Sequence, residues 1–273
     1  MNAEMNLEGE QSGLVEQYKN PSKLETRIQF HGRFSVSERR WGNWVFDQFE
    51  FPSHSQILEL GCGIGNLWRL NRERIGMGWS AVLGDFSQGM VEKARANLEG
   101  VGGRFHFAVI EAGDIPFGVG RFDVVIANHM LYHVPDVHWT LRQIWRVLKP
   151  GGRLYASTNG VGHMAEMEAL TPKEIPFRPV GEVIGKFTLE NGGELLRPYF
   201  TEIELRRHKD GLLVTEAEPI VDYSLSRLSI FTEGIQIGED KRQEFIEKVK
   251  VRMDESGGAI RITKDSGIFI ARR

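Results

Sequence analysis

Two features of the sequence predict a doubly wound α/β fold with a mostly parallel sheet. Residues 57–60 form a short apolar run that ends in Gly61, Gly63 and Gly65, and a helix-like pattern follows. This arrangement is typical of a buried strand that turns sharply into a helix. Short apolar runs then alternate with helical periods over residues 56–158, which indicates βαβ units with right-handed crossovers.

The glycine turn also limits the kind of ligand. Glycines let a ligand approach the main chain, and a helix start offers free N–H groups. A dinucleotide fingerprint requires Gly-x-Gly-x-x-Gly, but Asn66 stands at the sixth position counted from Gly61, and Trp68 at the sixth counted from Gly63. No Gly-Lys-Ser/Thr follows, so a P-loop is excluded. The turn is therefore expected to serve another ligand.

The other elements follow in chain order. Strands are predicted at residues 56–60, 79–83, 104–109, 122–127, 152–158, 202–207 and 267–272. Ser87 and Asp136 are predicted helix N-caps. Behind Asp136, apolar residues recur at i, i+3, i+4 and i+7, namely Leu141, Ile144, Trp145 and Leu148. Residues 149–152, Lys-Pro-Gly-Gly, should end that helix.

Three regions lie outside this alternation. Residues 1–13 are polar and are expected to form a disordered tail. Residues 14–51 should be helical, with one apolar face formed by Trp41, Trp44, Val45 and Phe49. This segment is interpreted as a lid over the ligand, although simple packing on the domain explains the same pattern. Residues 160–187 are expected to form an irregular insert, and residues 212–256 a helical cap that includes a helix at 241–253.

Composition favours a cytoplasmic protein that acts on a small molecule. The 273 residues carry a net charge of −3, with 26% charged and 41% hydrophobic residues, so nucleic acid is not the expected partner. Cys62 is the single cysteine, which fits a reducing compartment. No signal peptide is apparent, and no apolar run approaches the roughly 20 residues that span a bilayer.

Residues 56–158 resemble the class I S-adenosylmethionine-dependent methyltransferases. Glu59 and the three glycines match the family's first motif, Glu-x-Gly-x-Gly-x-Gly. Further blocks follow in the family's order and spacing at residues 81–90, 112–117, 122–128, 131–136 and 147–152. By pattern, the chain is most similar to the small-molecule methyltransferases of ubiquinone and menaquinone biosynthesis.

The resemblance implies a Rossmann-like seven-stranded sheet in the order 3-2-1-4-5-7-6, with strand 7 antiparallel. The methyltransferase domain would then comprise residues 52–211 and 257–273. S-adenosylmethionine is the implied cofactor and S-adenosylhomocysteine the product. The sulfonium of S-adenosylmethionine is a cation, so this cofactor tolerates a carboxylate at the end of the first strand. A phosphate-containing ligand would be repelled by the same carboxylate.

The resemblance further implies which residues bind the cofactor. Asp85 would accept the ribose hydroxyls, Asp114 the adenine amino group, and Asn128 would present its backbone carbonyl to the methionyl amino group. Phe86 is open to either an adenine contact or a core role, and Tyr18 corresponds to an aromatic residue over the ligand in relatives. The complete predicted set is Tyr18, Glu59, Gly61, Cys62, Gly63, Gly65, Asn66, Asp85, Phe86, Met90, Gly113, Asp114, Ile115 and Asn128.

His133 and His129 are the candidate catalytic residues. A neutral histidine can accept a substrate proton near pH 7, but either residue could instead orient its loop. Methyl transfer can also proceed without a strong base when the acceptor is held within ~3–3.5 Å of the methyl group. No metal is expected, because Pro135 disfavours the regular helix that the two histidines would need to act as joint ligands.

The predicted function is transfer of a methyl group to a small-molecule acceptor. Two alternatives remain open. An RNA methyltransferase would need a basic face, and a non-catalytic S-adenosylmethionine-binding regulator or subunit would keep the same cofactor residues. The sequence does not determine the acceptor atom or the oligomeric state.

Overall fold

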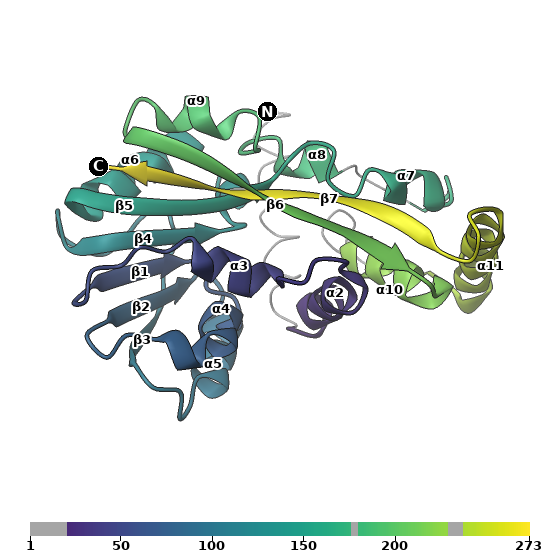
Figure 1. Ribbon diagram of the computed structural model, residues 1–273, viewed down its shortest axis with the longest axis horizontal. Helices are drawn as coiled ribbons and strands as arrows, with labels where there is room; N and C mark the ends of the chain where they lie inside the picture. The colour runs from purple at the N-terminus through teal and green to yellow at the C-terminus, as the bar shows by residue number, and fades with distance from the viewer. Residues whose placement is uncertain (1–20, 176–179, 229–236) are drawn as a thin grey trace. The chain divides into compact units, whose positions relative to one another are not determined.

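The computed structural model describes residues 21–175, 180–228 and 237–273, in which the chain forms two compact units (Figure 1). Unit 1 contains the described residues that fall within Met1–Glu38, Gly162–Glu182 and Lys209–Asp265. Unit 2 comprises Arg39–Val161, Val183–His208 and Ser266–Arg273. Each unit thus draws on three separate segments of the chain. The tail predicted at residues 1–13 lies outside the described residues.

The sheet has seven strands in the order β3-β2-β1-β4-β5-β7-β6. Its first five strands pair in parallel, and β7 pairs antiparallel with β5. The predicted strand order and the antiparallel seventh strand are confirmed. The strands are β1 (Gln56–Leu60), β2 (Ser80–Asp85), β3 (Arg104–Val109), β4 (Phe122–Asn128), β5 (Leu148–Asn159), β6 (Thr201–Val214) and β7 (Ile260–Arg272).

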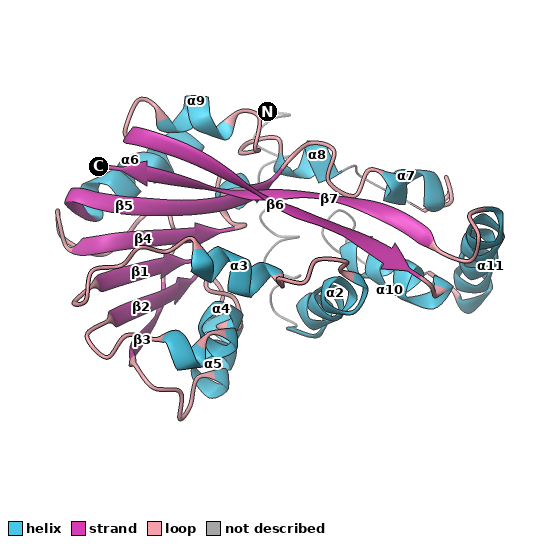
Figure 2. Ribbon diagram, in the orientation of Figure 1, coloured by secondary structure: helices cyan, strands magenta, loops and turns pink. Residues whose placement is uncertain are grey.

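Alternating side chains of the central strands pack into two apolar layers. Leu58 and Leu60 of β1 join one layer, whereas Ile57, the residue before Leu58, joins the other. This alternation follows from the period of two in a strand. Helices α6 (Val137–Val147) and α9 (Gly192–Leu196) contribute to the first layer. Helices α3 (Trp41–Asp47), α4 (Asn66–Leu70) and α5 (Gln88–Asn97) contribute to the second (Figure 2). Helices on both faces make the sheet doubly wound, as predicted.

Both predicted N-caps are present. The Ser87 side chain accepts a hydrogen bond from the backbone N–H of Met90, and Asp136 accepts one from that of Trp139. The predicted end of α6 is wrong by one residue, because the helix stops at Val147 and Leu148 already begins β5.

Trp145 also departs from the apolar face predicted for α6. Its side chain is 38% exposed, and the guanidinium of Arg273 lies 3.8 Å from its ring centroid. A tryptophan can remain partly exposed at low cost when a cation stacks on its face.

Unit 1 is mainly helical around its own apolar core. That core includes Phe30, Met167, Ile220 and Phe245, each at most 4% exposed. The predicted irregular insert at 160–187 contains two short helices, α7 (Glu166–Leu170) and α8 (Val180–Ile184). Within the predicted cap, residues 212–214 end β6, and helices α10 (Ala217–Leu228) and α11 (Glu239–Glu255) follow.

The helical segment predicted at residues 14–51 contributes to both units. Helix α2 (Pro21–Phe34) belongs to unit 1, and α3 belongs to unit 2. The apolar face predicted around α3 is present, since Val45 is 1% exposed and its aromatic neighbours pack partly buried against the same core.

Candidate functional site

The carboxyl ends of β1, β2 and β4 lie side by side at the centre of the sheet. Leu60 of β1 pairs with Gly84 of β2 and with Ala127 of β4, so the residues that follow these strands share one edge. In open parallel sheets, ligands bind at this edge where the strand order reverses. Glu59, Asp85 and Asn128, three of the residues predicted to bind the cofactor, lie at the ends of these strands.

The turn after β1 requires its glycines. Gly61, Gly63 and Gly65 have φ angles of +70°, +53° and +75°, which side chains rarely permit. A Cβ at Gly61 would lie 2.9 Å from the Cβ of Met130. Gly65 is the N-cap of α4 in the left-handed conformation. The turn therefore adopts a backbone conformation that alanine would strain.

Asp85, the last residue of β2, is joined to the glycine turn. Its Oδ2 accepts a hydrogen bond from the Gly63 N–H at 2.9 Å, and its Oδ1 accepts one from the Ser87 N–H at 3.0 Å. Burial raises the pKa of this carboxyl, and the backbone hydrogen bonds oppose the rise. Each carboxylate oxygen has a further lone pair, so Asp85 can hold the turn and still accept a ligand hydroxyl.

Glu59 is a deeply buried acid beside this turn. Glu59 is only 2% exposed, and its Oε2 accepts a hydrogen bond from Trp68 Nε1 at 2.7 Å. Burial raises the pKa of Glu59 to about 7, hydrogen bonds from Trp68 and Asn128 oppose this rise, and the charge of Asp85 adds to it. A carboxyl held by neutral donors gains most from a positively charged ligand.

Asn128, at the end of β4, has a buried side-chain oxygen that accepts no hydrogen bond from the described residues. Its side-chain amide donates to Glu59, whereas its Oδ1 is buried and has no hydrogen-bond partner among the described residues. Such unsatisfied atoms are rare and costly in folded proteins. Glu59 and the Asn128 Oδ1 together form an acceptor pair suited to a ligand ammonium or sulfonium group.

The loop after β3 presents the third group of predicted residues. Asp114 is exposed, and Ile115 is 2% exposed. The backbone carbonyl of Gly113 accepts a hydrogen bond from Trp139 Nε1 at 2.7 Å. In the described ranges, the Asp114 carboxylate accepts no hydrogen bond and the Ile115 N–H donates none. Both groups are available to a ligand.

Other predicted cofactor residues differ in exposure. Phe86 is 40% exposed, which suits a ligand contact, whereas the Met90 side chain is completely buried. Burial raises the pKa of the Cys62 thiol, which is thereby kept protonated and is a poor nucleophile. Asn66 Oδ1 accepts two hydrogen bonds from Arg69. Tyr18 lies outside the described residues.

The two candidate catalytic histidines lie just beyond β4. His129 has a φ of +50°, and its N–H donates to the Ser157 carbonyl at 3.0 Å. Its ring lies 5.1 Å from that of Trp41, centroid to centroid. His133 ends a 3₁₀ turn (Leu131–His133), with its ring 4.4 Å from that of Tyr132. His129 directly follows Asn128 and is therefore nearer along the chain to the proposed ligand groups.

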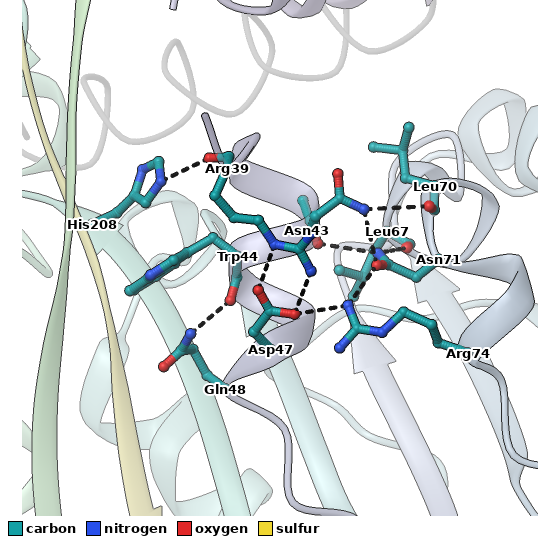
Figure 3. A network of polar contacts seen from close by, with 11 residues as sticks. Arg39, Asn43, Trp44, Asp47, Gln48, Leu67, Leu70, Asn71, Arg74 and His208 are labelled. Atoms are coloured by element: carbon teal, nitrogen blue, oxygen red, sulfur yellow. Dashed lines mark hydrogen bonds and ion pairs between the residues drawn. The ribbon is translucent and has the colours of Figure 1, made fainter. Parts of the chain in front are cut away.

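Helix α3, which carries Trp41, is fixed to the rest of unit 2 by polar contacts (Figure 3). Asp47 bridges Arg39, at 2.6 Å, and Arg74, at 2.8 Å. Asn43 donates to Asn71 Oδ1, and a ring nitrogen of His208 lies 3.0 Å from the Arg39 carbonyl oxygen. This network holds Trp41 against His129 in a defined position.

Sequence reasoning missed four side chains that shape the site. Trp68 bonds Glu59, Trp41 packs on His129, and Trp139 and Arg146 bond the loop after β3. Only Trp68, nine residues from its partner, had a local signal, because it lies in the short helix that directly follows the glycine turn. The other contacts join residues that are 26 or more positions apart.

In residues 21–175, 180–228 and 237–273, no three His, Cys, Asp or Glu side chains form a group that could hold a metal ion. None of the helices in these ranges combines the length and apolar composition needed to cross a bilayer.

A family model described as a methyltransferase domain matches residues 58–156. The ubiquinone/menaquinone biosynthesis C-methyltransferase of Desulfotalea psychrophila is 32% identical to this chain over 116 residues, which are 42% of this chain and 46% of that protein. The chain thus spans about half the length of the curated relatives it matches.

Solved structures share the fold. Phosphoethanolamine N-methyltransferase 2 of Haemonchus contortus, in complex with S-adenosyl-L-methionine, has a TM-score of 0.58 at 19% identity, covering 93% of this chain and 57% of that one. The [4+2]-cyclase SpnF has a TM-score of 0.58 at 18% identity, covering 97% and 96%. At these identities the likeness establishes the fold and leaves the reaction open. Residues 58–156, which contain the glycine turn and the central strands, are thus similar in sequence to a methyltransferase domain.

Proposed function

We propose that this chain is an S-adenosylmethionine-dependent methyltransferase that transfers a methyl group to a small molecule, with S-adenosylhomocysteine as product. The observation that carries the proposal is the edge formed by Glu59, Asp85 and Asn128. Among the described residues, it combines a buried carboxyl without a cationic partner, an acid anchored on the glycine turn, and an unsatisfied amide oxygen. Three acceptors suit a ligand that carries positive charge and hydroxyl groups.

These residues fit S-adenosylmethionine better than a phosphate-containing cofactor. Asp85 would accept the ribose hydroxyls, and Asp114 with the Ile115 N–H would bind the adenine edge. Glu59 and Asn128 Oδ1 would face the methionyl end, where the cationic groups are. When bound, this cofactor supplies a methyl group on a sulfonium, which is already a good leaving group. A diphosphate placed against Glu59 and Asp85 would instead be repelled.

We assign His129 to the acceptor side of the site, with His133 as the second candidate. Ser157 and Trp41 fix the position of His129, and a neutral imidazole at this place could take a proton from an acidic acceptor. The ubiquinone- and menaquinone-pathway relatives, together with the net charge of −3, favour a small acceptor over nucleic acid. A pH profile of methyl transfer would reveal whether a histidine titrates.

The test is calorimetric titration with S-adenosylmethionine and S-adenosylhomocysteine. We expect wild type to bind both, and Asp85→Asn to bind about 10- to 100-fold more weakly, because a hydrogen bond to a charged group contributes about 1.5–3 kcal/mol. Glu92→Gln, on the exposed surface of α5, is the matched control and should bind like wild type.

The absence of binding by wild type would refute the proposal. Binding without release of a labelled methyl group to any acceptor would favour a non-catalytic or non-methylating use of the fold. Transfer to RNA, suppressed by a competing polyanion, would favour the nucleic-acid alternative.

A further inference from the structure

Helix α6 holds the loop after β3 at three of its carbonyl groups. Trp139 Nε1 donates to the Gly113 oxygen at 2.7 Å. The guanidinium of Arg146 donates to the Ile115 oxygen at 2.8 Å and to the Phe117 oxygen at 2.5 Å. The two donors lie in the first and last turns of the helix, so the loop is held along the whole length of α6.

Both donors are themselves fixed. The Trp139 backbone N–H donates to the N-cap Asp136 at 2.9 Å, and the guanidinium of Arg142 lies 5.8 Å from its ring centroid. Arg146 also donates twice to Gln143 Oε1, at 3.0 and 2.8 Å. Trp139 is 47% exposed, so burial of its ring does not explain its position. Its indole N–H has a defined task in holding the loop.

These bonds engage the carbonyl groups of the loop and leave its recognition groups available. Asp114 is exposed, its side chain has no hydrogen bond to the described residues, and the Ile115 N–H donates to none of their acceptors. A loop that is fixed through its carbonyls presents the remaining donor and acceptor at a constant separation. Preorganised polar groups discriminate between ligands better than mobile ones do.

We propose that Trp139 and Arg146 are positioning residues that determine how selectively this loop recognises the adenine ring. The inference rests on the proposed function, because Asp114 and Ile115 can select adenine only if the adenosyl cofactor binds there. Neither Trp139 nor Arg146 needs to touch the ligand. Their effect is to keep the acceptor of Asp114 and the Ile115 N–H matched to the 6-amino group and the ring nitrogen of adenine.

The experiment compares S-adenosylhomocysteine with its inosine counterpart, in which a 6-oxo group replaces the 6-amino group. Trp139→Phe keeps an aromatic ring of smaller size and removes the N–H donor. We expect this variant to bind S-adenosylhomocysteine about 3- to 10-fold more weakly, the effect of one lost neutral hydrogen bond, with little change for the inosine compound. The selectivity ratio should therefore fall by the same factor, and Arg146→Met should lower it further.

Trp145→Phe is the matched control, because Trp145 lies on the same helix, is similarly exposed and contacts Arg273 instead of the loop. Its selectivity ratio should equal that of wild type, and thermal melts should show that all variants are folded. If Trp139→Phe lost the same affinity for both ligands, the bond from Trp139 to Gly113 would serve only the structure of the loop, and the inference would be overturned. Unchanged affinity would overturn it as well, whereas failure of wild type to bind either ligand would refute the proposed function itself.

Discussion

Glu59 in unit 2 and Asp210 in unit 1 are both carboxylates shielded from solvent, but their partners differ. Glu59 is bonded by the neutral donors Trp68 and Asn128, and its pKa is raised to about 7. The Asp210 side chain, 1% exposed, forms an ion pair with Lys264, itself 7% exposed. Burial alone would raise the pKa of Asp210, but Lys264 outweighs it and the pKa is lowered.

The difference separates an acid that is neutralised within the fold from one that the proposed ligand would neutralise. Asp210 also accepts hydrogen bonds from the Ser35 hydroxyl at 2.8 and 2.9 Å, so it links the end of α2 to β6 and β7 within unit 1. Nothing comparable neutralises Glu59 among the described residues. Unit 1 satisfies its buried acid internally, whereas unit 2 keeps one at a cost in stability that a cationic ligand can recover.

The largest effect is expected in unit 1. Lys264→Met would leave the Asp210 carboxylate buried without its cation, and we expect the free energy of unfolding to fall by about 3–5 kcal/mol. Urea unfolding measures this loss. The control is Arg242→Met, which removes an ion pair to Asp222 whose partners are 29% and 49% exposed, and should cost at most about 1 kcal/mol. Equal losses in the two variants would show that Asp210 does not depend on Lys264.

The next effect depends on pH. The pKa of Glu59 is about 7 in the folded chain and about 4.3 when unfolded, so the folded state binds the extra proton. Its stabilising contribution is therefore complete below about pH 4 and is lost as the pH rises through 7, a fall of about 3–4 kcal/mol. Asp210, with a lowered pKa, should behave oppositely and lose its contribution only as the pH falls below about 4.

Urea unfolding at pH 5 and pH 8 tests this contrast. Glu59→Gln should abolish most of the stability difference between the two pH values. S-adenosylmethionine should stabilise wild type more at pH 8 than at pH 5, because its cations favour the ionised carboxylate. A pH dependence that Glu59→Gln leaves intact would assign the titration to another group.

The smallest effects come from one substitution made once in each unit. Gly61→Ala in unit 2 places a side chain at a φ of +70° and 2.9 Å from Met130, and we expect it to cost about 1–2 kcal/mol. Gly32→Ala lies in α2 of unit 1, where no atom is within 4 Å of the added Cβ, and should stabilise by about 0.5–1 kcal/mol. Thermal melts of both variants give the signs, and a shift in the same direction for both would contradict this interpretation.

Much of unit 2 could be predicted because its signals are local. The strand at residues 56–60 and the caps at Ser87 and Asp136 depend on side chains within a few positions of one another. The end of α6 was predicted one residue late, since Leu148 continues the helical period although its backbone is already extended. The spacing of apolar residues indicates which face of a helix is buried, but it does not indicate where the backbone changes from helix to strand.

Unit 1 was harder to predict because its parts are distant in sequence. Its core joins residues near 30, 167, 220 and 245, and no local pattern indicates that these positions meet. The strands β6 and β7 were predicted at 202–207 and 267–272, but they extend to Val214 and begin at Ile260. Pairing between two strands extends a strand beyond what its own sequence signals.

The sequence alone determined the class of fold, the strand order by resemblance, and the carboxylates and glycines of the site, because these depend on motifs of a few adjacent residues. The tertiary structure alone decided how those residues are completed. It gave Glu59 neutral partners, left Asn128 Oδ1 without one, paired Asp210 with Lys264, and brought Trp139 and Arg146 to the loop after β3. Such contacts form between segments that are brought together only when the chain folds. Their energies depend on burial, which the unfolded chain does not provide.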